Sequence, residues 1–150
     1  MYQVIVFVHV LSAIVAVGCN ATYAVWLTRG SMDREHLLFA LRGIKFMDDR
    51  IANPAYGVLL ITGVLQVVMS GRSWREPWIE WAIALFVLLG IVAFAAYTPA
   101  LNRQIKLLSE RGADDADYLA ADRRQTMLGV ILMLIAVAIV ALMVFRPGGA

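Results

Sequence analysis

The sequence predicts an all-α membrane protein, a bundle of four transmembrane helices. Apolar residues make up 61% of the 150 residues, against roughly half in a typical soluble protein. Four runs contain no charged residue, at 1–28, 51–71, 81–102 and 125–145. A bilayer core takes about 20 helical residues to cross, and runs this long are typical of helices rather than the ~10-residue alternating strands of a barrel.

These runs predict one integral membrane domain over residues 1–150, surrounded by lipid bilayer. The expected spans are at about 2–28, 53–71, 79–102 and 123–145. Net charge of +2 without a basic stripe argues against nucleic-acid binding. The single cysteine, Cys19, precludes an internal disulfide. No nucleotide-binding, serine-hydrolase or zinc-protease motif is present, so catalytic residues stay unknown and enzymatic activity stays open.

The first run lacks the basic segment that opens a signal peptide, and we expect it to be kept as a span. At ~100° per residue, its small and polar side chains share one arc, whereas Val, Ile and Leu occupy the other sides. Small and polar residues of a membrane helix face other helices. The predicted inward residues are His9, Ser12, Ala13, Ala16, Asn20 and Tyr23.

Between the first and second runs, apolar residues recur at helical spacing with charges between them. Leu37, Leu41 and Ile44 belong to this pattern. It predicts either a short amphipathic cytoplasmic helix at the membrane surface or an extension of the second span. Asn53 and Pro54 are suited to an N-cap and a first helical position, so we expect the second span to begin there.

The second span carries its own candidate inward face, and the third and fourth spans have marked ends. Pro99 is expected to kink the third span because proline lacks a backbone donor. The dipeptide Arg146-Pro147 ends the fourth span. Three tryptophans near the start of the third span, Trp74, Trp78 and Trp81, are typical of a membrane interface. The candidate inward residues of the second span are Thr62, Gly63, Gln66, Met69 and Ser70.

The distribution of basic residues predicts the orientation. Ten of the 13 Lys and Arg residues lie in segments 29–50 and 103–124. The positive-inside rule places these segments in the cytoplasm. We therefore expect a multi-pass protein of the cell inner (plasma) membrane with both termini on the outer side. A homo-oligomer or other membrane subunits are expected partners.

His9 is the candidate binding residue, because an intramembrane ionisable group is a functional hypothesis by default. Three hypotheses stay open. In the first, His9 forms only a packing hydrogen bond with a neighbour such as Gln66 or Ser12. In the second, it is an axial ligand of a b-type haem iron, with Met69 or a second protomer's His9 opposite. In the third, it donates a hydrogen bond to a quinone or another lipophilic molecule. The candidate cofactor-binding set is His9, Ser12, Gln66 and Met69.

Four stretches carry a resemblance: FVHVLSAIVAVG, DRIANPAYGVLLITGVLQVV, AAYTPALNRQ and LMVFRPG. The chain resembles a family of bacterial four-helix predicted membrane proteins of unknown function. It is more distantly similar to HemJ-type protoporphyrinogen oxidases, which share the first-helix histidine, the proline and glycine of the second helix, and a final basic-proline pair. That likeness implies a haem-binding role for His9. It carries no further residue, because the family's lysine has no counterpart after Trp78 in WIEWAIAL.

Overall fold

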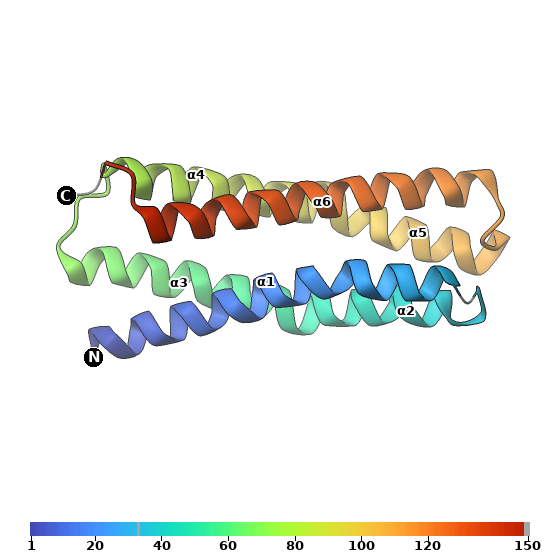
Figure 1. Cartoon of the computed structure of the whole chain (residues 1–150), viewed down its shortest axis with the longest axis horizontal. Helices are drawn as coiled ribbons and strands as arrows, with labels where there is room; N and C mark the ends of the chain where they lie inside the picture. The colour runs from blue at the N-terminus through green and yellow to red at the C-terminus, as the bar shows by residue number, and fades with distance from the viewer. Residues whose placement is uncertain (33, 149–150) are drawn as a thin grey trace.

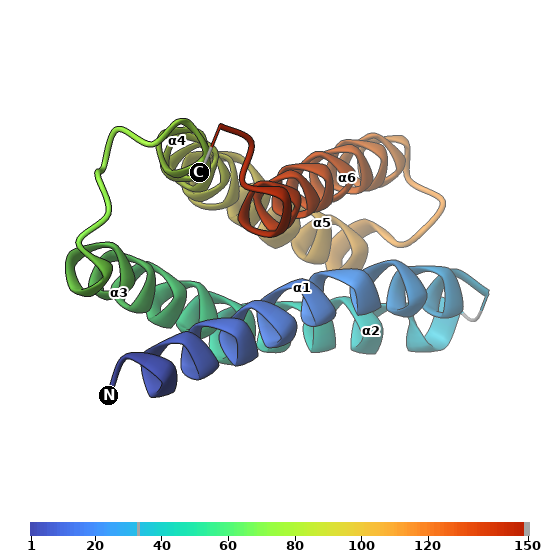
Figure 2. The same cartoon turned by 60° about the vertical axis from the view of Figure 1, so that its left-hand side comes forward.

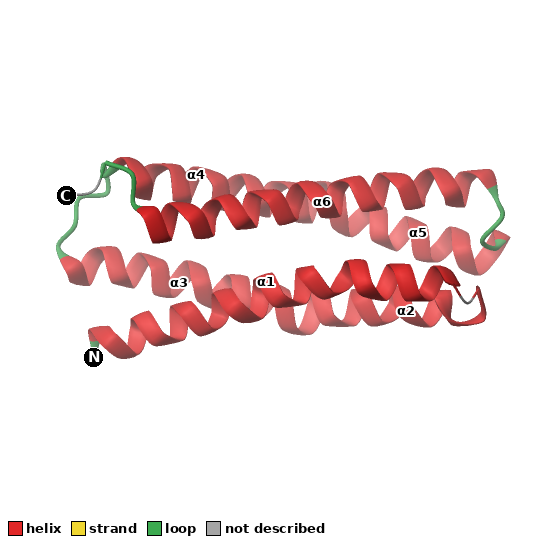
Figure 3. Ribbon diagram, in the orientation of Figure 1, coloured by secondary structure: helices red, strands yellow, loops and turns green. Residues whose placement is uncertain are grey.

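The computed structural model describes residues 1–32 and 34–148. Within this part the chain forms helices joined by short loops, and no strand is present (Figure 3). Two of the elements, η1 and η2, are π-helical. The helices are α1 (Tyr2–Met32), α2 (Arg34–Met47), η1 (Asp48–Ala52), α3 (Asn53–Ser70), α4 (Pro77–Val92), η2 (Ala93–Tyr97), α5 (Thr98–Arg111) and α6 (Ala116–Phe145).

Four stretches are long and apolar enough to cross a membrane: Tyr2–Met32, His36–Ser70, Pro77–Arg111 and Ala116–Phe145. The second stretch runs through α2, η1 and α3, and the third runs through α4, η2 and α5. The predicted fold class, an all-α membrane protein with four spanning helices, is therefore confirmed. The helices extend beyond the uncharged runs because amphipathic segments continue the second and third runs without a break.

The four stretches run up and down, so both chain termini and the α3–α4 loop lie at one end (Figure 1). We call this the terminal end. The opposite end carries the α1–α2 and α5–α6 connections, and we call it the basic end, because segments 29–50 and 103–124 hold ten of the 13 Lys and Arg residues. Figure 2 shows two helical hairpins that converge toward the basic end and separate toward the terminal end.

Contacts between elements follow this arrangement. One hairpin pairs α1 with α2, η1 and α3, and the other pairs α6 with α4, η2 and α5. The hairpins meet through α2 against α5 and through α1 against α6. Among the residues that the structure places, α3 and α4 make no close backbone contact. The terminal half of each hairpin therefore leaves one flank to lipid or to another protein.

The amphipathic segment between the first two spans is present as α2, and it continues into the second span. Its apolar side chains pack inside the bundle, where Leu41 and Ile44 are fully buried between α1 and α5. The second of the two interpretations thus describes it. The expectation that Asn53 caps a new helix is wrong, because the backbone is right-handed helical at both Ala52 and Asn53.

A proline is the second residue after each π-helical element. The Asn53 N–H donates to the Asp48 carbonyl, five residues back, and Pro54 comes next. The Thr98 N–H donates to Ala93 in the same way, before Pro99. Because proline has no N–H and clashes with the carbonyl one turn earlier, a wider turn lets the helix continue past it. The predicted start of a helix at Pro54 is therefore wrong, and at Pro99 the third stretch continues through a π turn.

The core lies where the hairpins converge. It is built from tyrosine, leucine, isoleucine and alanine side chains of six elements, so it spans both hairpins. A smaller cluster of Ala16, Ala55 and Leu59 joins α1 to α3. At Gly30, α1 lies so close to α2 that a methyl group added to the glycine would stand 2.8 Å from the Ala40 Cβ. Apolar side chains elsewhere face outward, as expected for a lipid-embedded protein.

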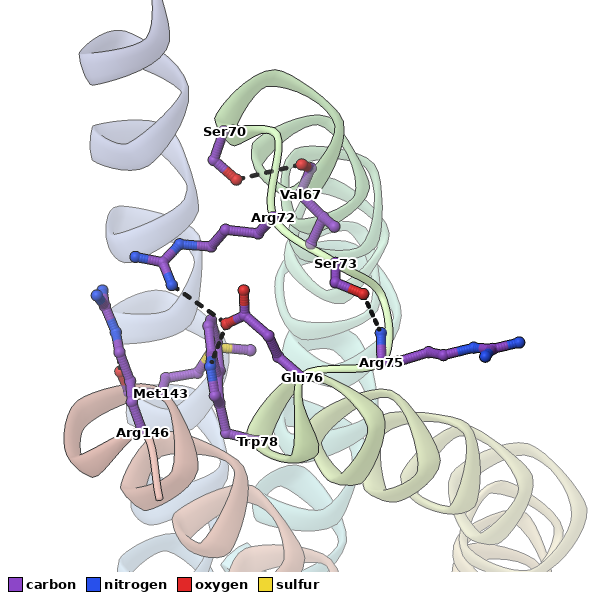
Figure 4. Close-up of polar contacts among 9 residues, drawn as sticks. All are labelled: Val67, Ser70, Arg72, Ser73, Arg75, Glu76, Trp78, Met143 and Arg146. Atoms are coloured by element: carbon purple, nitrogen blue, oxygen red, sulfur yellow. Dashed lines mark hydrogen bonds and ion pairs between the residues drawn. The ribbon is translucent and has the colours of Figure 1, made fainter. Parts of the chain in front are cut away.

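The terminal end is fastened around Trp78, as the close-up in Figure 4 shows. The Glu76 carboxylate accepts hydrogen bonds from the Trp78 indole N–H at 2.8 Å and from Arg72 at 3.1 Å. The Arg146 guanidinium lies 5.5 Å from the Trp78 ring centroid. Of the three interfacial tryptophans, Trp78 is thus buried, and it links the α3–α4 loop to the end of α6.

Candidate functional site

His9 lies on α1 in the terminal half of the bundle and faces α3. Its Nδ1 is 2.8 Å from the Thr62 hydroxyl. Its Cε1 would be 3.3 Å from a methyl group built on Gly63. The ring therefore lies against the backbone of α3 at a residue without a side chain. His9 is half-buried, so part of the imidazole stays accessible from outside the chain.

The Thr62 hydroxyl determines which ring nitrogen carries the proton. This hydroxyl lies 2.7 Å from the Val58 carbonyl, to which it donates. A hydroxyl has one proton to give, so toward His9 it acts as an acceptor and Nδ1 is the donor. In the neutral ring Nε2 then holds the lone pair. In the part of the chain that the structure describes, no hydrogen bond to Nε2 is present.

The other predicted site residues make no hydrogen bond to His9 among the described residues. Ser12 donates its hydroxyl proton to the Val8 carbonyl of its own helix at 2.8 Å. Gln66 donates to the Thr62 carbonyl at 3.4 Å. Met69 is 44% exposed and lies seven residues from Thr62 along α3, about 10 Å at 1.5 Å per residue. The hydrogen-bond partner of His9 is therefore neither Gln66 nor Ser12.

The inward arc predicted for the first helix agrees with the structure in the C-terminal half of the arc, at Ala16, Asn20 and Tyr23. Ala16 and Tyr23 are buried. The Asn20 amide donates to the Tyr56 hydroxyl at 2.8 Å. His36, the second histidine, lies on α2 toward the basic end. Within the described ranges, no three His, Cys, Asp or Glu side chains form a metal-binding group.

A second polar group was not predicted, and it lies where the hairpins meet. Asp48, on η1, is only 7% exposed, and the Tyr23 hydroxyl of α1 is 3.4 Å from its carboxylate. Lys45, one turn away, forms an ion pair with Asp49 instead. Among the described residues, no Lys or Arg forms a salt bridge with Asp48.

Two glutamines are buried in the same half of the bundle. Gln125, at 2% exposure, has no hydrogen-bond partner for either side-chain amide atom. Gln104 donates to Asp122 at 2.8 Å while its own oxygen lacks a partner.

The sequence did contain a pattern that predicts the burial of Asp48. Small and apolar residues recur at helical spacing from Ile44 through residues 52, 55 and 59, and Asp48 occupies one position of that series.

Comparison with known proteins gives a family match over almost the whole chain. The model of the family described as "Predicted integral membrane protein (DUF2269)" matches residues 3–147. No curated protein matches the chain. No solved structure matches it either.

Proposed function

The chain belongs to the DUF2269 family of predicted integral membrane proteins. On the geometry around His9, we propose that this membrane protein binds a lipophilic redox molecule, a b-type haem first of all, through Nε2 of His9. The hydrogen-bonded series from His9 through Thr62 to the Val58 carbonyl carries this proposal. It supports a single tautomer and a fixed ring orientation. A ligand at His9 would therefore meet a lone pair already aimed and not engaged elsewhere.

The donor set fits a haem. Histidine ligands of metals almost always donate their other ring N–H to an oxygen, which fixes the tautomer and raises the basicity of the ligating nitrogen. Thr62 supplies that oxygen at 2.8 Å. When bound, a b-type haem would supply one-electron redox chemistry. The chain's own contribution is to hold the imidazole neutral and oriented, inside a region from which lipid excludes water.

The same geometry changes the quinone hypothesis. With Nδ1 engaged by Thr62, the neutral ring accepts a hydrogen bond at Nε2 and does not donate one. His9 would therefore receive the O–H of a reduced quinol. His9 is only half-buried, and α3 and α4 make no close backbone contact among the placed residues, although the Phe86 ring of α4 meets the Tyr56 ring of α3. A second protomer or another membrane subunit is the proposed cover for the remaining side.

The test is the visible spectrum of the full-length protein purified in detergent. We expect a Soret band after expression with haem supplementation, lost in His9→Ala and kept in His36→Ala, the matched histidine control toward the other end. Circular dichroism should show that both variants keep their helices. A colourless wild type after supplementation, or an unchanged Soret band in His9→Ala, contradicts haem ligation by His9.

The alternative proposal is a non-catalytic scaffold or accessory subunit, in which the His9 bond only joins α1 to α3. The close packing of the ring on Gly63 supports it. A quinol analogue distinguishes the remaining cases. If it raises the thermal stability of wild type but not of His9→Ala, the quinol site is supported. If neither haem nor the analogue affects the protein, the scaffold is supported.

A further inference from the structure

We propose that Asp48, Tyr23, Tyr97 and Gln125 form a binding site for a small monovalent cation where the two hairpins meet. The four residues come from η1, α1, η2 and α6, so the site joins both hairpins. It is separate from His9, because Tyr23 lies 14 residues further along α1, about 21 Å away at 1.5 Å per residue. It does not depend on the proposal for His9.

The carboxylate of Asp48 supplies the charge. It is 7% exposed, and the nearby Lys45 is engaged by Asp49. A buried charge without an ionic partner is costly, and in proteins such groups are usually paired or bind a metal ion. The Tyr23 hydroxyl is 3.4 Å from the carboxylate, longer than the ordinary 2.5–3.0 Å of an O–H···O bond. The Asn53 side chain also hydrogen-bonds to this carboxylate, and the remaining lone pairs of its oxygens can be directed at a cation.

Gln125 supplies the independent evidence that something polar is bound here. Its side chain is 2% exposed, and both amide atoms lack a hydrogen-bond partner. The Tyr97 hydroxyl interacts with this amide, but with a distance or angle outside that of an ordinary hydrogen bond. The Tyr97 ring packs on Gly129, one turn further along α6. A buried amide left unpaired in this way costs about 1–3 kcal/mol and calls for an explanation such as an ion or water.

The two π turns contribute two of the four residues, and π turns occur frequently at functional sites. Asp48 belongs to one of these turns and Tyr97 to the other.

The charge balance favours a monovalent ion. One carboxylate with neutral hydroxyl and amide oxygens carries a single negative charge, which one alkali-metal ion neutralises. Ca²⁺ sites use six to eight oxygens, with carboxylates among them. In the part of the chain described, no second Asp or Glu joins Asp48 in a metal-binding group.

The experiment measures thermal unfolding of the full chain in detergent, in NaCl, KCl and choline chloride at equal ionic strength. We expect the melting temperature to rise with Na⁺ or K⁺ relative to choline, by about 5–10 °C at 100 times the Kd. Asp48→Asn should abolish this rise. The adjacent Asp49→Asn is the matched control, since Asp49 is exposed and bonded to Lys45, and it should keep the rise.

Two further measurements cover the case in which Asp48→Asn does not fold. Equilibrium binding of ²²Na⁺ to wild type should give about one ion per chain, and Gln125→Leu should weaken that binding about tenfold. The proposal is overturned if wild type melts at the same temperature in all three salts and retains no ²²Na⁺. It is also overturned if Asp48→Asn responds to the salts as wild type does.

Discussion

The hydrogen bond between His9 and Thr62 can be measured as a coupling free energy, independently of any cofactor. The two perturbations are Thr62→Val, which removes the hydroxyl while keeping the shape, and His9→Phe, which keeps a ring without nitrogens. Combined in a double-mutant cycle, they isolate the energy of the bond, because the loss of the Thr62 bond to Val58 occurs on both sides of the cycle and cancels.

The structure gives the expected magnitude. Interhelical hydrogen bonds in a membrane protein average about 0.6 kcal/mol with a maximum near 1.7 kcal/mol. The His9–Thr62 bond is 2.8 Å long and its acceptor is 7% exposed, so we place it in the upper part of that range. A coupling of about 1–1.5 kcal/mol corresponds to about a 5- to 12-fold change in the unfolding equilibrium constant.

The assay is reversible unfolding by SDS in mixed micelles, followed by circular dichroism, for wild type, both single variants and the double variant. Thr28→Val is the control, because the Thr28 hydroxyl bonds only to Ala24 of its own helix. Its coupling to His9→Phe should stay within about 0.3 kcal/mol of zero. If the Thr62 cycle gives no more coupling than the Thr28 cycle, the assignment of Nδ1 as donor to Thr62 is refuted.

Two other predictions concern packing and orientation. Gly30→Ala should destabilise the protein, because the added methyl group stands 2.8 Å from the Ala40 Cβ and such overpacking costs about 1–3 kcal/mol against a gain of about 1 kcal/mol in helix propensity. Ala40→Gly in the same chain should remove the clash, and SDS unfolding that finds the two changes additive would contradict it. For orientation, cysteine is introduced at Ser73 or Ser109 in a Cys19→Ala background. An impermeant maleimide should label position 73 in intact cells and position 109 only after permeabilisation, and the reverse pattern would invert the proposed orientation.

Much of the fold could be predicted from the sequence because lipid imposes simple rules. An uncharged run of 20 or more residues must form a helix to satisfy its backbone, so fold class and span number follow from composition. The inward side of the first helix also followed, since Ala16 and Tyr23 are buried where the small and polar arc predicts. Helical periodicity on one chain identified that face without knowledge of its partners.

The hydrogen-bond partner of His9 could not be predicted with the same security. Depth counted from helix ends placed Gln66 beside His9, whereas the structure places Thr62 there, one turn further from the α3 terminus. One turn is 5.4 Å, and the entry angle and loop length of each helix shift relative depth by about that much. The inward faces that carry His9 and Thr62 were therefore predicted correctly, but the depth at which the first and second spans meet was wrong by one turn.

Asp48 was missed for a different reason, namely that Pro54 was interpreted as the start of a helix. Proline is equally suited to a first turn and to a position after a π turn, and local sequence does not distinguish the two. Only the longer periodicity, from Ile44 to Leu59, indicates a continuous helix that carries Asp48 inward. The charged residues Lys45 and Asp49 lie on either side of Asp48, a pattern that is typical of a solvent-exposed surface.

The two π turns also allow a test of whether the buried polar side chains around Asp48 serve only to satisfy backbone groups that the prolines leave unpaired. If their role were to satisfy the backbone that Pro54 and Pro99 leave unpaired, these side chains would donate to the backbone carbonyls concerned. The observed bonds go elsewhere: the Asn20 amide donates to the Tyr56 hydroxyl, and the Tyr23 hydroxyl is directed at the Asp48 carboxylate. The Gln125 amide donates no hydrogen bond to a carbonyl group. The polar atoms thus exceed what the interrupted helices require, and the proposed cation would be held by the oxygen atoms among them.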